Sequence, residues 1–262
     1  MDTLPRAREY LVKTQCGDGS WGSGDPFVCA RAMYALLGGM PDETLVKGLR
    51  YLEDSQAPDG HFSPKTKMYS DASNTAYALI VLNRFDYGKA SLPVSRGILW
   101  LLENQNEDGS WGVNKKKKAF TTTLCLRSLY TFYLSGLARF SKGLNFSQDY
   151  LMCLGFADEP VSHVYAPILN LKRIGYLDVA MEKKFLGYAS DAARGAVASG
   201  NVADAAYLLG TLKALDEGDV SAMLGEWLAT TQYDDGGFGN KLGDASGPSW
   251  TALAVLALEN RL

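Results

Sequence analysis

Histidine is scarce in this 262-residue chain, which contains two, and cysteine is hardly more common, with four. The cysteines stand alone at positions 16, 29, 125 and 153. A zinc site usually needs three or four nitrogen, sulfur or oxygen ligands at recognisable spacing, and this pattern does not supply them. Isolated cysteines are also typical of a reducing compartment. We therefore expect a cytoplasmic protein with no metal and no other cofactor.

The chain also lacks an excess of charge and a long apolar run. It has 26 basic and 29 acidic residues, a net charge of −3, which gives no general case for binding nucleic acid. No apolar run is long enough to cross a bilayer, and the first residues do not resemble a signal peptide. No linker or low-complexity segment interrupts the sequence, and 47% of its residues are hydrophobic. These features predict one globular domain over residues 1–262.

What the chain does contain is one short phrase in four copies, Q-x-x-D-G-x-aromatic. The copies begin at Gln15, Gln56, Gln105 and Gln232. In each copy Asp-Gly favours a tight turn, since glycine tolerates positive φ. The glutamine amide has a donor and an acceptor for the backbone groups that helix ends leave unpaired. We call each copy a staple, and we predict that it joins helices and has no catalytic role.

Amphipathic runs precede the staples, and runs rich in small and apolar residues follow them. The former pattern is typical of a surface helix and the latter of a helix buried on most sides. Two further pairs lack a clean staple. The expected outer helices cover residues 4–14, 45–55, 95–104, 146–154, 179–198 and 220–231, and the expected inner helices cover 30–37, 73–80, 121–126, 163–169, 203–209 and 250–255.

Six helical hairpins of about 44 residues each are a common arrangement for a repeat protein. If they close on themselves, they form a single all-α (α/α)6 barrel, which is the fold we predict. An open solenoid is the alternative, although neither end of the chain carries an obvious polar capping repeat.

The staples resemble the QW motifs of the squalene–hopene cyclase and terpene cyclase superfamily, which shares its barrel with protein prenyltransferase β subunits. The resemblance spans residues 4–240. It implies the α/α-barrel fold and, as an activity, the cyclisation of polyenes or isoprenoids. The prenyltransferases also need a zinc site of Asp, Cys and His, and this sequence has no Asp-x-Cys pair for one.

Class II terpene cyclases begin their reaction with an acidic D-x-D-D-T-A segment that opens an inner helix. The matching segment here begins at Asp71, and its Thr75 and Ala76 also agree with the family's pattern. Ser73, however, stands where the resemblance places the proton-donating aspartate, and Asn74 replaces the last aspartate. Neither a hydroxyl nor an amide is strong enough as an acid to protonate an alkene.

The resemblance places the chemistry at the inner-helix N-termini, where residues of different loops converge. Asp71 is the main acid–base candidate, with His163 as its partner, and Ser73 and Asn74 complete the catalytic set. A helix-capping aspartate and a hydrogen-bonded rim histidine are the structural alternatives. The candidates for substrate binding are Asp25, Phe27, Lys65, Lys67, Phe120, Tyr165, Asp204, Tyr207 and Trp250.

Basic residues fall in several loops between a staple and the next inner helix. A cationic rim would attract an anionic ligand such as a diphosphate or a carboxylate, whereas solvated loops are the simpler interpretation, which we favour for residues 115–118. The aromatic residues, 11% of the chain, offer π faces that stabilise positive charge, although most will pack in the core.

Three functions fit these patterns. The first is a non-standard terpene-cyclase-like enzyme that cyclises or isomerises an apolar, possibly anionic isoprenoid-type substrate, with Asp71 and His163 acting on an epoxide, enol or carbonyl. The second is a degenerate barrel that binds such a ligand, or a protein partner, without changing it. The third, a carbohydrate-active enzyme, would need two carboxylates such as Asp71 and Asp204. The sequence favours the first and leaves the oligomeric state open.

Overall fold

The computed structural model describes residues 3–38, 42–64, 72–114, 117–156 and 159–262. Within these ranges the regular elements are helices, with isolated β-bridges between single residues. The outer helices are α1 (Thr3–Lys13), α3 (Asp42–Asp54), α5 (Leu92–Glu103), α7 (Ala138–Cys153), α9 (Val179–Ala198) and α11 (Gly218–Thr230). The inner helices are α2 (Pro26–Leu36), α4 (Ala72–Arg84), α6 (Lys118–Thr131), α8 (Val161–Arg173), α10 (Val202–Ala214) and α12 (Pro248–Leu258). The alternation predicted from the sequence is confirmed.

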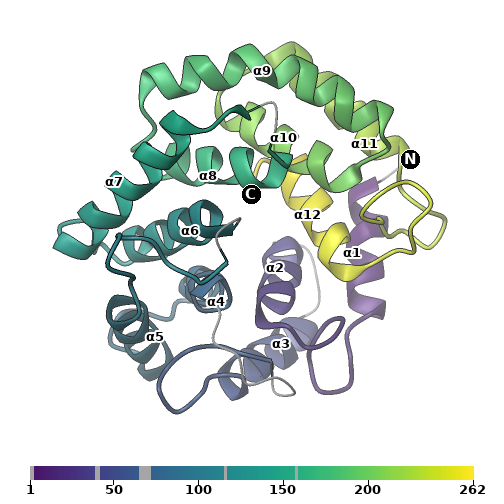
Figure 1. The fold of residues 1–262 in the computed structure, drawn as a ribbon. Coiled ribbons are helices and arrows are strands. Elements are labelled where there is room, and N and C mark those ends of the chain that lie inside the picture. Colours follow the sequence, from purple (N-terminus) through teal and green to yellow (C-terminus); the bar gives the residue numbers. More distant parts are fainter. Residues whose placement is uncertain (1–2, 39–41, 65–71, 115–116, 157–158) are drawn as a thin grey trace. The chain divides into compact units, whose positions relative to one another are not determined.

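The chain forms two compact units. Unit 1 comprises residues 1–14, 34–40 and 155–262, and unit 2 comprises residues 15–33 and 41–154. In unit 1, α10 packs against α8, α9, α11 and α12, and in unit 2, α4 packs against α5 and α6 (Figure 1). The prediction of a single domain stays a prediction.

Burial separates the two kinds of helix as the sequence pattern indicated. Every residue of α4 from position 72 to 82 is buried, and the middle of α12 is buried on all sides. The outer helix α9 buries only five of its 20 residues, at intervals of three or four. Small side chains suit the inner helices because they allow neighbouring backbones to approach closely.

The four staples share one hydrogen-bonding scheme. In each copy the glutamine Nε2 donates to the glycine carbonyl of its own turn, at 2.8–3.1 Å. The same nitrogen also donates to a carbonyl in the first turn of another outer helix. These acceptors are Thr44 of α3, Pro93 of α5, Arg139 of α7 and Thr3 of α1, at 2.8–2.9 Å. The glutamine therefore reaches the next outer helix and skips the inner helix that follows it in the chain.

The last staple connects the two ends of the helix order. Gln232 follows α11 and donates to Thr3, so α11 is joined to α1 in the way that α3 is joined to α5. Helix α1 also packs against α12, and Arg8 forms an ion pair with Glu259. Helix α1 is therefore a neighbour of the last hairpin, α11 and α12, within unit 1. This arrangement contradicts the open solenoid that the sequence left as an alternative.

The aspartate and the aromatic residue of each staple have separate tasks. The aspartate Oδ1 accepts the backbone N–H two residues later, at 2.8–3.3 Å, which shapes the turn. The aromatic ring is fully buried in all four copies. Its backbone N–H donates to a side chain of the following inner helix. The acceptors are the Cys29 sulfur and the Thr75, Thr122 and Thr251 hydroxyls.

Replacing Thr122 with valine tests this link, because the change keeps the side-chain shape and removes the acceptor. The buried Trp111 N–H, 2.9 Å from the hydroxyl, would lose its partner. We expect the free energy of unfolding in urea to fall by about 1–3 kcal/mol. Thr230→Val at the exposed end of α11 is the control and should change it by less than about 0.5 kcal/mol. Equal effects of the two substitutions would contradict the assignment.

Candidate functional site

Residues in the first two turns of α2, α4 and α6, all in unit 2, form an aromatic group around an arginine. The Phe27 ring of α2 lies 4.8 Å from the Tyr77 ring of α4 and 6.0 Å from the Phe120 ring of α6, between centroids. The guanidinium carbon of Arg31 lies 4.4 Å from the Phe27 centroid and 5.9 Å from that of Tyr77. Arg31 is only 3% exposed, whereas Phe27 and Phe120 are partly exposed. The arrangement holds a cation on aromatic faces.

The segment that matches the cyclase acid motif opens α4 in the same unit. Thr75 accepts the Phe62 N–H of the second staple, so this matching residue has a structural task. Ser73 and Asn74 are buried, at 9% and 3% exposure. The Asn74 Nδ2 has no hydrogen-bond acceptor within the described part of the chain. We call Phe27, Arg31, Asn74, Tyr77 and Phe120 the Arg31 group.

Asp25, a predicted substrate-binding residue, caps α2. Its Oδ1 accepts the Phe27 N–H at 2.9 Å, and its carbonyl accepts the Cys29 N–H. Asp25 precedes Cys29 by four residues, as Asp71 precedes Thr75 in the sequence. Asp71 lies outside the described residues, as do Lys65 and Lys67. Its role as an acid therefore stays a prediction, with helix capping as the alternative.

A second group of polar side chains lies in unit 1, at the N-termini of α8 and α10. The His163 Nδ1 lies 3.7 Å from the Glu159 Oε2, and the histidine side chain is 15% exposed. Tyr165 is buried, and its ring meets the Phe185 ring edge-on at 4.5 Å. Burial raises the pKa of the Tyr165 hydroxyl, and the nearby Asp204 adds to the effect. This hydroxyl therefore stays protonated at neutral pH.

Asn201 caps α10 and also binds the Asp204 side chain. The Asn201 Oδ1 accepts the Asp204 N–H at 3.1 Å, and its Nδ2 donates to the Asp204 carboxylate at 2.7 Å. Asn201 also pairs with Lys241 in an isolated bridge. Burial raises the pKa of Asp204, against the opposing influence of Lys241, His163 and the Asn201 hydrogen bond. We call His163, Tyr165, Asn201, Asp204 and Lys241 the Asp204 group.

The raised pKa of Asp204 gives a signed prediction for stability. The folded state binds the Asp204 proton more tightly than the unfolded state does, so stability falls as the pH rises through the folded pKa of Asp204. Asp204→Asn removes the partly buried carboxylate, and it should therefore change the free energy of unfolding more favourably at pH 7 than at pH 4. Urea midpoints at several pH values measure this difference.

Asp108 is the matched control, because its shift has the opposite sign. Partial burial acts to raise the pKa of Asp108, but the hydrogen bonds from Lys118 and Ser110 outweigh it and lower this pKa to about 2. Asp108→Asn should therefore cost stability at pH 7, and the loss should shrink between pH 4 and pH 2. The same pH dependence for both variants would contradict the assignment of Asp204.

The remaining predicted residues lie near the starts of inner helices. Tyr207 is half-buried in the second turn of α10, and Trp250 is half-buried in the first turn of α12. Lys118, the first residue of α6, forms a 2.8 Å ion pair with Asp108 of the third staple, and the predicted solvated loop over residues 115–118 stays a prediction. The predicted relation between Asp71 and His163 stays a prediction, because Asp71 lies outside the described residues.

Sequence reasoning missed Arg31 as a site residue. Its position within an otherwise apolar and small-residue helix was the available signal, since charged residues are seldom buried without a partner.

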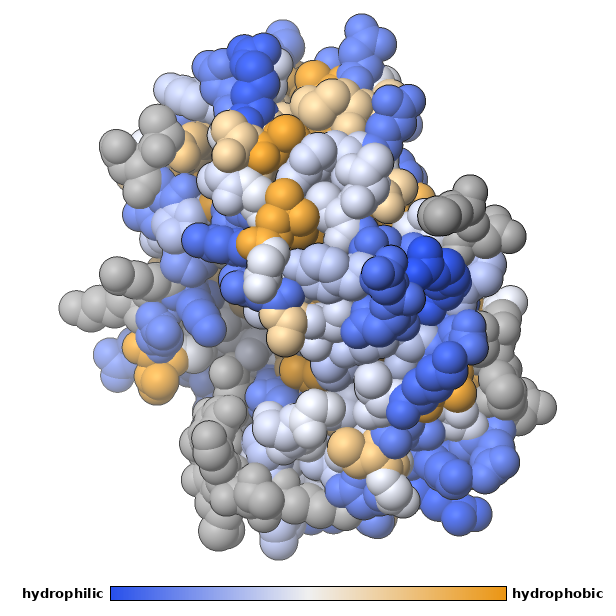
Figure 2. Space-filling model, turned by 90° about the vertical axis from the view of Figure 1, so that its right-hand side faces the viewer, coloured by the Kyte–Doolittle hydropathy of each residue, from blue (hydrophilic) through white to orange (hydrophobic). Residues whose placement is uncertain are grey.

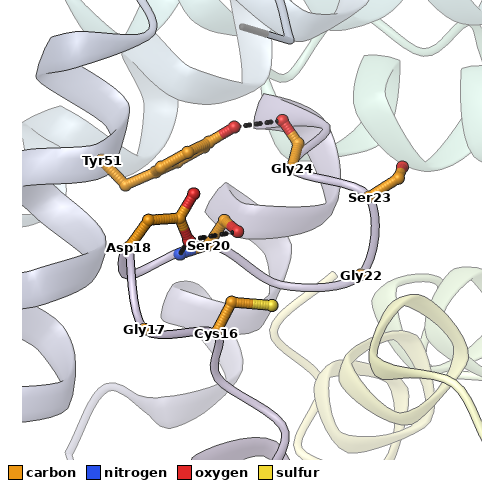
Figure 3. Close-up of a pocket in the computed structure, with 8 residues that line it drawn as sticks. All are labelled: Cys16, Gly17, Asp18, Ser20, Gly22, Ser23, Gly24 and Tyr51. Atoms are coloured by element: carbon orange, nitrogen blue, oxygen red, sulfur yellow. Dashed lines mark hydrogen bonds between the residues drawn. The ribbon is translucent and has the colours of Figure 1, made fainter. Parts of the chain in front are cut away.

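A hollow of about 350 Å³ lies outside both groups, at the first staple (Figure 3). Polar groups at the hollow bond to one another: Ser20 donates to Asp18 at 2.7 Å, and the hydroxyl of Tyr51 from α3 donates to the Gly24 carbonyl at 2.5 Å. The pocket is lined by Cys16, Gly17, Asp18, Ser20, Gly22, Ser23, Gly24 and Tyr51. These bonds stabilise the first staple and its contact with α3, so they give the polar groups around the hollow a structural role.

Within the part of the chain that the structure describes, no set of three or more His, Cys, Asp or Glu side chains is gathered as a metal would require. Among the described helices, none combines the length and the apolar character needed to span a membrane. The face shown in Figure 2 is largely hydrophilic, and the apolar side chains visible on it are scattered.

Solved structures share this fold at low sequence identity. The ligand-free type II terpene cyclase MstE from Scytonema matches with a TM-score of 0.71 and 13% identity, over 98% of this chain and 96% of that one. An MstE variant in complex with geranylgeranyl dihydroxybenzoate, its substrate, matches with a TM-score of 0.67 and 14% identity, over 98% and 95%. A protein from Actinoplanes matches with a TM-score of 0.68 and 14% identity, over 99% of this chain and 98% of that one. The predicted all-α fold of the α/α-barrel type is confirmed.

Sequence comparison identifies the family. The squalene–hopene cyclase of Zymomonas mobilis is 34% identical over 127 residues, which is 41% of this chain and 19% of that protein. The chain thus spans about a fifth of the length of this curated relative. Residues 1–140 match the squalene–hopene cyclase C-terminal domain. Because this match covers more than half of the sequence, the chain belongs to the squalene–hopene cyclase C-terminal domain family.

Proposed function

We propose that this chain is a terpene-cyclase-like enzyme that cyclises or isomerises an isoprenoid-type substrate. The observation that carries the proposal is the Arg31 group, in which Phe27, Tyr77 and Phe120 gather at the inner-helix N-termini of a cyclase-family chain. Aromatic rings supply apolar surface that packs against the hydrocarbon of such a substrate. The MstE structures with a geranylgeranyl substrate and with the product merosterolic acid A support the same class of ligand.

The initiating step must differ from protonation of a plain alkene. Ser73 and Asn74 replace the two acids that the family's motif places there. Asp71 is the acid that remains, and we propose that it works with His163 to protonate a more basic group, such as an epoxide, an enol or a carbonyl. General acid catalysis of this kind requires a positioned acid and a substrate oxygen within hydrogen-bonding reach.

The same replacements favour a second function, a barrel that binds an isoprenoid ligand and releases it unchanged. One experiment separates the two. The protein is incubated with prenyl diphosphates, epoxidised polyenes and polyene acids, and the bound and extracted compounds are identified by mass spectrometry. A chemically altered compound supports the enzyme, and retention of unaltered ligand supports the binding protein. Failure to retain any member of the panel would contradict both functions.

A further inference from the structure

Tyr165 carries an unused hydroxyl in the interior of unit 1. Only 3% of this residue is exposed, and within the described part of the chain its hydroxyl forms no hydrogen bond. The residue is held in place, since its ring packs edge-on against Phe185 of α9 and its carbonyl accepts the Thr211 hydroxyl of α10 at 3.2 Å. Buried tyrosine hydroxyls usually have a partner, because an unpaired one loses its bonds to water without replacement. The hydroxyl therefore marks a place that a ligand oxygen can complete.

Asp204 lies close to this hydroxyl, across the contact between α8 and α10. Burial and then the nearby charge of Asp204 raise the pKa of Tyr165, which places the two groups within electrostatic reach of one another. The Asp204 Oδ2 accepts the Asn201 amide at 2.7 Å, whereas the Oδ1 has no hydrogen bond among the described residues. Burial favours the protonated acid. In that form Oδ2 keeps its bond to Asn201, and Oδ1 carries a proton for donation.

Two basic side chains act on Asp204 from neighbouring elements, His163 at the start of α8 and Lys241 after the fourth staple. Within the described residues, neither forms an ion pair with this carboxylate. The His163 Nδ1 is buried and has no hydrogen-bond partner there, since the Glu159 Oε2 is 3.7 Å away. Asp204, Tyr165 and His163 thus all have hydrogen-bonding atoms that the described chain leaves unused.

We propose that Tyr165 and Asp204 form a subsite that donates two O–H hydrogen bonds to the oxygen of a carbonyl or epoxide on an isoprenoid-type substrate. Such an oxygen accepts hydrogen bonds and has no proton to donate, so it complements two donors. Tyrosine beside a neutral carboxylic acid is an effective donor pair for a carbonyl oxygen, because both stabilise the negative charge that develops there. The proposal rests on the proposed function and narrows its substrates to those with a neutral acceptor oxygen.

The test measures binding of a ketone, an epoxide and a hydrocarbon. Geranylacetone, farnesene and the terminal epoxide of farnesene are equilibrated with the protein by dialysis, and the intact compounds are quantified by mass spectrometry. Tyr165→Phe removes one donor and keeps the ring, so it should weaken binding of the ketone or the epoxide about 3–10-fold and leave farnesene unchanged. The probe that loses more identifies the group as a carbonyl or an epoxide. Tyr188→Phe, on the exposed side of α9, is the matched control and should alter none of the three affinities.

Asp204 adds a pH dependence that a purely structural role would not produce. Affinity for the oxygenated probe should fall as the pH rises through the folded pKa of Asp204, because the acid then loses the proton that it donates. In Asp204→Asn, whose amide keeps a donor at every pH, this fall should disappear, although His163 and Lys241 are unchanged in the variant. A fall that persists in Asp204→Asn would remove Asp204 from the subsite.

The outcomes distinguish this inference from the proposed function. If Tyr165→Phe weakens all three probes alike, or none of them, the subsite is wrong while the isoprenoid class stands. If no probe binds to the unaltered protein, both the subsite and the isoprenoid class are wrong. Circular dichroism checks that each variant is folded, and if Asp204→Asn is not, the Tyr165 variant decides alone.

Discussion

Replacement of Asp71 by asparagine should lower the turnover of an isoprenoid-type substrate by about 10²–10⁴-fold, the usual contribution of a positioned general acid. Asp71 is the one acid that remains of the segment matching the family's motif. Asparagine has nearly the same shape and can still cap a helix, so the variant separates acid catalysis from capping. The rate is measured on whichever compound of the panel is converted.

Two companion variants make this result specific. His163→Gln should reduce turnover as well if the histidine supports the acid, and its effect should be far from additive with that of Asp71→Asn. Asp191→Asn changes an exposed aspartate paired with Arg194 and should leave turnover unaltered. Unchanged turnover of the Asp71 variant would show that the proton comes from another group.

A methyl group added at Gly19 should destabilise the protein strongly, by about 2–4 kcal/mol. Gly19 has φ = +89°, and a Cβ at this position would collide with the Lys47 carbonyl of α3. The equivalent glycines at 60, 109 and 236 have φ of +106°, +88° and +87°, and each faces a carbonyl of an outer helix. The expected effect therefore comes from the staple itself and not from one loop.

Gly17 provides an internal control two residues away. It belongs to the same staple, and a Cβ built on it meets nothing within 4 Å. Gly17→Ala should change the urea midpoint little, whereas Gly19→Ala should lower it markedly. If the two alanine variants unfolded at the same urea concentration, the close approach of the turn to α3 would not be a source of stability.

The helices and the staples were predictable because their signals are local. Apolar spacing identifies a helix within a dozen residues, and Asp-Gly identifies a turn within two. The second acceptor of each glutamine was not predictable in this way. Gln15 donates to Thr44 and Gln232 to Thr3, and these partners are brought near by the packing of whole helices.

The candidate site was predicted in part for the same reason. Phe27 and Phe120 were identified from their places at inner-helix N-termini, and the structure brings them together. The cation at Arg31 was missed because its significance depends on rings from two helices. The unused Asn74 donor was beyond sequence reasoning, since hydrogen bonding of a buried amide is decided by its neighbours.

The bond between Gln232 and Thr3 also bears on how the chain folds. It links residues 229 positions apart, whereas the other three staple glutamines bond to outer helices 29–37 positions away. Contacts between distant residues form late, because a long loop must close before they are gained. Unit 2 draws on a stretch of sequence that ends at residue 154, but unit 1 needs both α1 and α11. During synthesis, α1 must therefore wait for its partner until more than two hundred further residues have emerged.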